Sequence, residues 1–162
     1  MNPPIRDKSH QAGLWKGIAN KTVDVIGSDH APHTLEEKMQ PYPKSPSGMA
    51  GVQTLLPIML NFVNDGKLSI HDLVRLVSYN PCKIYNIKNK GQIKIGFDAD
   101  LVIVDAKKKF KITNSWIASK CKWTPYDQIK VTGVPISTIV NGNIVMQDNQ
   151  ILGDPKGKKV KF

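Results

Sequence analysis

Residues 21–33, KTVDVIGSDHAPH, pass within a few positions from an apolar run to a cluster of polar, chemistry-bearing side chains. The run TVDVI is typical of a β-strand, and Gly27 ends it. Asp29, His30 and His33 follow directly. Parallel-barrel enzymes place catalytic side chains at the carboxyl ends of strands, where an aspartate can bind zinc or accept a proton. The same spacing also fits an Asx-turn with surface histidines, and on spacing alone the two interpretations are level.

The composition is that of a soluble globular protein, since the 162 residues are 40% hydrophobic and 22% charged. No apolar run approaches the roughly 20 residues of a membrane helix, and the first residues lack the apolar core of a signal peptide. Cys82 and Cys121 belong to no CxxC or Cys/His pattern. We therefore expect a cytoplasmic protein with reduced, structural thiols and no membrane partner.

The formal net charge of +10 comes almost entirely from lysine, because only two of the 23 basic residues, Arg6 and Arg75, are arginine. A nucleic-acid-binding protein more often interleaves arginines and aromatic residues on one surface. The dense lysine clusters, at 107–109 and 156–162, lie at expected turns or ends. This pattern favours a solvated basic surface over a nucleic-acid partner.

A loop and then a helix are expected after the polar cluster. Residues 34–50 contain three prolines and one glycine, which predicts a loop. From residue 51 apolar side chains recur at helical spacing, which predicts an amphipathic helix over 51–64. Pro57 is expected in or near the first turn of this helix.

A second helix is expected to begin at Ser69, because Asp72 follows three residues later in a pattern like a capping box. This helix should end near Asn80, since the residue before a proline disfavours helical geometry. A short helix over 81–87 should follow, with Pro81 at its first position.

Strands are expected in the second half of the chain. QIKIG (92–96) and DLVIVD (100–105) are predicted strands joined by a turn. Two β-rich runs flank Asn141 and Gly142, which predicts a tight hairpin. The first half is therefore expected to be α/β and the second half β.

Four motifs together closely resemble dihydroorotase, a cyclic amidohydrolase of the amidohydrolase superfamily: NPPIR (2–6), SDHAPH (28–33), SPSGMAGVQT (45–54) and GFDADLVIVD (96–105). The resemblance implies a (β/α)8 barrel bearing a small β-sandwich, with the barrel incomplete in this chain. Residues 1–88 would be the carboxyl-terminal part of the barrel, comprising its eighth strand and the helices that follow. Residues 89–162 would be part of the composite β-sandwich.

The resemblance implies that two zinc ions assist the reversible cyclisation of N-carbamoyl-L-aspartate to dihydroorotate, in pyrimidine biosynthesis. Asp29 corresponds to an aspartate that touches the more buried zinc and carries a proton from the attacking hydroxide to the departing amide nitrogen. His33 corresponds to the histidine that binds the exocyclic carboxylate of the substrate, and Asn2 to a substrate-contacting asparagine. Ser47 and Gly48 match a dipeptide whose backbone contacts the pyrimidine ring, although many relatives have phenylalanine in place of Ser47.

Other polar residues are expected to be structural. The resemblance assigns no role to His30, and we expect it to be a structural residue or to support the residues that bind ligand. Asp98 and Asp100 invite a metal interpretation, but the family treats these positions as turn residues of the sandwich. His10 and His71 have no partners in the pattern and are expected at the surface.

Most of the zinc ligands that the resemblance implies have no counterpart in this sequence. The family uses a His-x-His pair, a carboxylated lysine and two further histidines, whereas this chain has four histidines and no such pair. A catalytic zinc ordinarily needs three protein ligands. We therefore expect the chain alone to be inactive. It would be the remnant of a decayed gene, one half of a split enzyme complemented by an amino-terminal chain, or a non-catalytic scaffold or homo-oligomerising protein.

Overall fold

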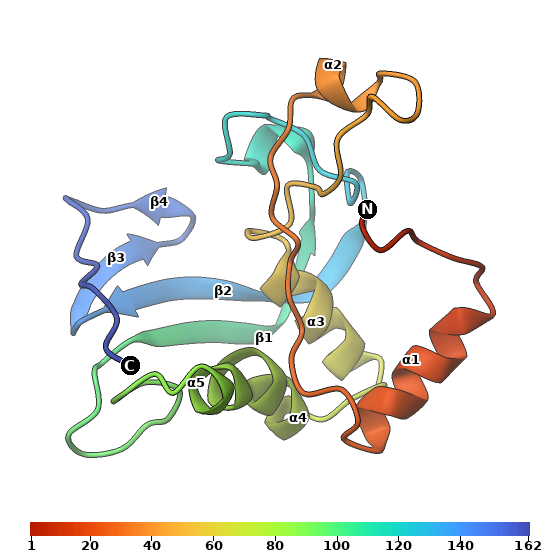
Figure 1. Cartoon of the computed structure of the whole chain (residues 1–162). Helices are drawn as coiled ribbons and strands as arrows, with labels where there is room; N and C mark the ends of the chain where they lie inside the picture. Colours follow the sequence, from red (N-terminus) through yellow and green to blue (C-terminus); the bar gives the residue numbers. More distant parts are fainter.

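The computed structural model describes residues 1–162 as a set of short helices packed beside one antiparallel sheet (Figure 1). Its strands follow one another in the order β1-β2-β3-β4. The helices are α1 (His10–Ala19), α2 (Leu35–Lys38), α3 (Leu55–Asn64), α4 (Ile70–Val74), the π-helical turn η1 (Arg75–Tyr79), α5 (Asn80–Ile84) and the 3-10 turn η2 (Asn114–Trp116). The strands are β1 (Leu101–Lys111), β2 (Lys130–Val140), β3 (Asn143–Gln147) and β4 (Gln150–Ile151).

The expected strand at 22–29 is extended but pairs with no other strand (Figure 1). Within 24–28 the only backbone-to-backbone hydrogen bond joins the Ile26 N–H to the Leu76 carbonyl at 3.2 Å. The Asn80 side chain also donates to the Asp24 carbonyl at 2.8 Å. A strand needs a neighbouring strand to satisfy its backbone, and none of the four strands lies along this segment. No strand therefore pairs with it on either edge.

Helix α3 begins at Leu55, four residues later than the periodicity predicts, because 52–54 form a turn. The backbone at Gly51 lies so close to Ser28 that a Cβ there would stand 2.4 Å from the Ser28 carbonyl oxygen. Pro57 lies in the first turn of the helix, as predicted, where its missing N–H costs no helical hydrogen bond.

The second helix begins as predicted but does not end at Asn80. The Ser69 hydroxyl accepts the Asp72 N–H at 3.0 Å and donates to the Asp72 carboxylate at 2.7 Å. The chain then continues through η1 into α5, with the Asn80 N–H bonded to the Arg75 carbonyl five residues back. Pro81 removes a donor and crowds the carbonyl four residues earlier, and this wider turn accommodates both effects. Pro81 lies at the second position of α5 and not at the first as predicted, because this helix begins at Asn80, and it ends at Ile84, three residues earlier than expected.

The sheet confirms two of the three strand signals predicted in the second half of the chain. DLVIVD enters β1, and the hairpin lies between β2 and β3, where Asn141 and Gly142 have φ values of 48° and 78°. Positive φ at both central residues is the signature of a type I′ turn. The strand prediction for 92–96 is wrong, because Ile93 and Ile95 are 91% and 101% exposed and nothing pairs with them.

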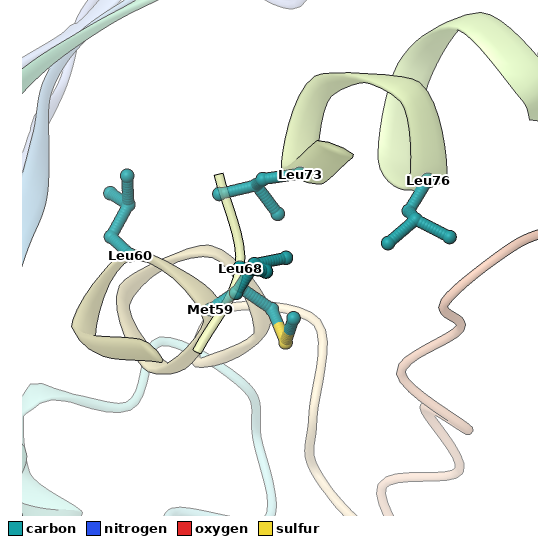
Figure 2. Packing of buried hydrophobic residues seen from close by; sticks show 5 residues of the cluster. All are labelled: Met59, Leu60, Leu68, Leu73 and Leu76. Carbon is teal, nitrogen blue, oxygen red and sulfur yellow. The ribbon is translucent and has the colours of Figure 1, made fainter. Parts of the chain in front are cut away.

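Two small apolar clusters hold the fold together. The larger cluster contains side chains from α3, α4 and η1, together with Leu68 from the turn between α3 and α4 (Figure 2). Val23 and Ile26 pack against it from the extended segment. The buried members are Met59, Leu60, Leu68, Leu73 and Leu76 in the larger cluster, and Ile112, Val131 and Val134 in the smaller.

The molecule is open for its size. Only 17 of the 162 residues are buried. The accessible surface is 11,317 Å², which is about 40% more than the roughly 8,000 Å² expected of a folded monomer of 18.0 kDa. None of the helices has the length and apolar character needed to cross a bilayer.

Candidate functional site

Two loops that carry predicted site residues are joined by a short parallel bridge between His30 and Met49. The Met49 N–H donates to the Asp29 carbonyl at 3.2 Å, and the Ala31 N–H donates to the Met49 carbonyl at 3.0 Å. The loop that follows the extended segment therefore lies directly against the loop that carries Ser47 and Gly48. The structure thus brings Asp29 and the Ser47–Gly48 dipeptide together.

Gly48 occupies a position that only glycine fits. It is buried and has a φ of 94°, and a Cβ there would stand 2.3 Å from the Cβ of Ala31. The N–H groups of Ser47 and Gly48 make no hydrogen bond within the chain. Unpaired backbone donors next to a buried glycine are free to bind an oxygen atom of a ligand.

Asp29 presents a free carboxylate. Its backbone has a φ of 44°, a left-handed conformation that aspartate tolerates better than most residues. The residue is exposed, and its carboxylate takes part in no hydrogen bond or ion pair within the chain. An ionised carboxylate without a protein partner can accept a proton or bind a cation.

His33 is held from three sides. Its N–H donates to the Ala31 carbonyl at 2.9 Å, and its carbonyl accepts the indole N–H of Trp123 at 2.8 Å. Its Nδ1 lies 3.7 Å from the carboxylate of Glu37. The Nε2 atom makes no bond within the chain, so the imidazole can donate to a ligand.

Glu37 is itself fixed by a capping box at the start of α2. The Thr34 N–H donates to its carboxylate at 2.7 Å, and the Thr34 hydroxyl accepts the Glu37 N–H at 3.2 Å. The Thr34 N–H, above all, holds the pKa of Glu37 below its usual value, with smaller contributions from the Thr34 hydroxyl and His33.

The remaining predicted residues lie outside this cluster or support it. His30 accepts the Val52 N–H on its Nδ1 at 3.4 Å, which is a supporting contact. Asn2 is exposed and its side chain makes no hydrogen bond, so its substrate role stays a prediction. Asp98 and Asp100 both bind the ammonium of Lys90, in the segment between the turn at 95–96 and the start of β1, and not in the turn itself.

Asp100 also accepts the Asn141 N–H at 2.8 Å at the β2–β3 hairpin. Lys90 chiefly, and then the Asn141 N–H, hold the pKa of Asp100 below its usual value. His10 and His71 are exposed, as expected.

Sequence reasoning missed two residues that support the site, Lys38 and Trp123. The Lys38 ammonium binds the carbonyls of Pro46 and Gly48, and Trp123 binds His33 from 90 residues away. Neither residue belongs to a spacing pattern, since a lysine on a short helix resembles any surface lysine. Only the fold reveals these contacts.

A groove of about 420 Å³ lies beside the site but does not contain its reactive groups. It is mainly apolar and includes His30, Gln53, Trp116 and Met146, whereas Asp29 and His33 lie outside it. The Gln53 side chain bridges the groove floor, donating to the Trp116 carbonyl at 2.9 Å and accepting the Ala118 N–H at 2.8 Å. The groove therefore marks where the second half of the chain packs against the start of α3.

The donors of this chain do not form the two-zinc centre that the resemblance implies. No three side chains of histidine, cysteine, aspartate or glutamate lie close enough together to hold a metal ion. Asp29 supplies one carboxylate, but it belongs to no group of three ligating side chains.

Comparisons with known proteins place the chain among cyclic amidohydrolases. The sequence pattern of the amidohydrolase family matches residues 6–145. A dihydroorotase of Pyrococcus horikoshii is 42% identical over 158 residues, which are 98% of this chain and 36% of that protein. The solved structure of an L-hydantoinase (dihydropyrimidinase) from Arthrobacter aurescens is similar with a TM-score of 0.88 and 35% identity, over 94% of this chain and 35% of that one.

A D-hydantoinase (dihydropyrimidinase) from Thermus sp. is similar with a TM-score of 0.90 and 28% identity, over 95% of this chain and 35% of that one. The chain thus spans little more than a third of the length of the proteins it matches.

Proposed function

Because the chain belongs to the amidohydrolase family and has the fold of about a third of such an enzyme, we propose that it is a segment of a dihydroorotase-type hydrolase. The observation that supports this most strongly is the match to a dihydroorotase, 42% identical along 98% of the chain. The reaction would be the reversible cyclisation of N-carbamoyl-L-aspartate to dihydroorotate. We assign residues 1–88 to the barrel and 89–162 to the β-sandwich of that enzyme.

The residues of this chain would bind the substrate and move a proton. His33 donates to the exocyclic carboxylate, since its Nε2 makes no hydrogen bond within the chain and its Nδ1 lies 3.7 Å from the Glu37 carboxylate. The unpaired N–H groups of Ser47 and Gly48 bind a ring oxygen. Asp29 holds the transferred proton on its free carboxylate. Asn2 would add a further polar contact to the ring.

Most of the zinc ligands would come from residues outside this chain, because Asp29 belongs to no group of three ligating side chains here. We therefore propose that the 162 residues are inactive alone and become part of an active site only when joined by the remaining strands. A split enzyme is one form of this arrangement. The alternative is a non-catalytic protein that acts as a scaffold or associates with itself.

A second candidate substrate is a cyclic amide without a carboxylate, because both solved structures named above are hydantoinases. His33 separates the two candidates, since a ring such as dihydrouracil offers it no carboxylate to bind. A site built to bind a charged group rejects a substrate that lacks it.

The test is hydrolysis of dihydroorotate by the purified chain, with zinc and bicarbonate supplied. The chain would be assayed alone and mixed with a companion segment, defined as the part of the Pyrococcus horikoshii dihydroorotase that lies outside the match. Turnover in the mixture that disappears in Asp29→Asn supports the proposal. Equal turnover of dihydrouracil points to the hydantoinase-type substrate. A stable complex without turnover points to the non-catalytic alternative.

A further inference from the structure

The side chain of Lys38 binds two backbone carbonyls of the loop that carries Ser47 and Gly48. Its ammonium donates to the Pro46 carbonyl at 2.6 Å and to the Gly48 carbonyl at 3.0 Å. The same residue accepts the Ser45 hydroxyl on its own carbonyl at 2.9 Å. Lys38 therefore joins the end of α2 to the far end of the loop.

This use of a lysine is unusual for a short surface helix. The Lys38 side chain is half-buried and forms no ion pair with a carboxylate. Lysine ammonium groups normally extend into water, because burial without a counter-charge is costly. Hydrogen bonds from a charged donor are stronger than neutral ones, so two of them fix the loop backbone firmly.

Because the peptide bond is planar, fixing a carbonyl group of the loop also fixes the direction of the N–H group in the same peptide. In a trans peptide the C=O and the following N–H point in opposite directions. Holding the Pro46 carbonyl toward Lys38 therefore turns the Ser47 N–H away from the ammonium, and this N–H has no partner within the chain.

The next fixed peptide unit is held at both ends. Its carbonyl, from Gly48, binds Lys38 at 3.0 Å, and its N–H, from Met49, binds the Asp29 carbonyl at 3.2 Å. Lys38 and Asp29 thus form hydrogen bonds with the two opposite sides of the Gly48–Met49 peptide. The Gly48 N–H, which also has no partner, lies between the two constrained units.

We propose that Lys38 is a positioning residue, which sets the direction of the Ser47 and Gly48 N–H groups for an oxygen atom of the cyclic amide. It acts through the two peptide units that it binds and does not itself touch the substrate. The identity of the ligand rests on the proposed function, whereas the constraint on the loop does not.

The test compares Lys38→Met, which keeps the length but removes the donor, with Lys38→Arg, which keeps a charged donor. Lys44→Met, at an exposed lysine of the same loop whose side chain makes no hydrogen bond, is the matched control. The first readout is amide hydrogen exchange of Ser47, Gly48 and Met49 in the labelled chain. We expect Met49 to exchange about tenfold faster in Lys38→Met, which corresponds to about 1.4 kcal/mol. Lys38→Arg should lie in between and Lys44→Met should match the wild type.

The second readout is the shift of the Ser47 and Gly48 amide signals when dihydroorotate, the cyclic amide, is added. Weaker binding by about tenfold in Lys38→Met, restored in part by Lys38→Arg, supports a positioning role. Unchanged exchange at Met49 and unchanged shifts would overturn the proposal. Faster exchange in Lys38→Met with no ligand shift in any variant would keep the constraint but remove the proposed substrate. If Lys38→Met fails to fold, Lys38→Arg decides, because its longer side chain and planar guanidinium present the donors to the two carbonyls in a different geometry from the ammonium.

Discussion

The indole N–H of Trp123 donates to the backbone carbonyl of His33 at 2.8 Å, and the two residues are 90 positions apart. Trp123 lies in the loop between η2 and β2, whereas His33 lies just before α2. The region proposed as the sandwich therefore supports a residue proposed to bind substrate. This contact links the two assigned parts of the chain directly at the candidate site.

Replacing Trp123 by phenylalanine removes this donor and keeps most of the apolar ring. We expect the free energy of unfolding to fall by about 1 kcal/mol, the net contribution of one hydrogen bond. Urea denaturation followed by circular dichroism measures this loss. The imidazole signals of His33 should also move in the nuclear magnetic resonance spectrum.

Trp116→Phe is the matched control, because it too removes an indole hydrogen bond, to the Asn149 side chain at 3.1 Å. It should leave the His33 signals in place. Unchanged His33 signals in Trp123→Phe would show that the contact does not position this residue.

Gly48→Ala tests whether the close approach of the two site loops is required. The added methyl group would stand 2.3 Å from the Ala31 Cβ, at a φ of 94°. Strain at a positive φ and overpacking together should lower the free energy of unfolding by about 2–4 kcal/mol. Gly27→Ala is the control, since nothing lies within 4 Å of its position. Equal stability of the two variants would contradict the loop contact.

Features that depend on a few neighbouring residues could be predicted from the sequence. The type I′ turn follows from Asn141 and Gly142, because both tolerate positive φ. The start of α4 follows from Ser69 and Asp72, which bond to each other and to no distant residue. The turn and the helix start are therefore determined by residues close to them in the sequence, and they can be predicted without knowledge of the rest of the fold.

Features that need a distant partner could not be predicted in this way. The alternation of Ile93 and Ile95 indicates strand propensity, but propensity does not supply a strand to pair with. The contacts of Lys38 and Trp123 join residues without a shared pattern. The role of Asp29 was suggested by its motif, whereas its free carboxylate is visible only in the structure.

Lys90 makes the stability of the sheet region depend on pH. The carboxylate of Asp100 first, and then that of Asp98, hold the pKa of Lys90 above its usual value. Lys90 chiefly holds the pKa of Asp100 below its usual value. The lowered pKa of Asp100 stabilises the fold at pH values above the ordinary carboxyl pKa, about 4. This stabilisation is lost as the pH falls through the pKa that Asp100 has in the folded protein. The raised pKa of Lys90 stabilises the fold at pH values below the ordinary lysine pKa, about 10.4. This stabilisation is lost as the pH rises through the pKa that Lys90 has in the folded protein.

Lys90→Met should therefore destabilise the protein most between about pH 5 and pH 9, by about 0.5–1 kcal/mol since the groups are partly exposed. The difference from the wild type should shrink in strong acid. Urea denaturation across this pH range measures it, with Lys120→Met at an exposed lysine as the control. A difference that stays constant down to pH 2 would mean that lost packing, not the ion pairs, causes the effect.

Substitution of the exposed residues Ile93 and Ile95 tests whether these side chains stabilise the fold of this chain or bind another polypeptide. They are 91% and 101% exposed, so they contribute no burial to this chain. The double variant Ile93→Lys/Ile95→Lys should therefore change the free energy of unfolding by less than about 0.5 kcal/mol. The molecule as a whole exposes about 40% more surface than a closed monomer of 18.0 kDa, and this excess is typical of one part of a larger assembly.

If the proposed companion segment covers this surface, the same double variant should weaken its association strongly, because two charges would be buried without partners. Co-elution of the two polypeptides in size-exclusion chromatography measures the effect, with Lys83→Met at an exposed residue of α5 as the control. Retained stability with lost co-elution would place these side chains in the interface. Undiminished co-elution would mean that the companion binds elsewhere. The extended segment at 22–28 would then be the next surface to test, since no strand pairs with it and its N–H groups at Asp24, Val25, Gly27 and Ser28 make no hydrogen bond within the chain.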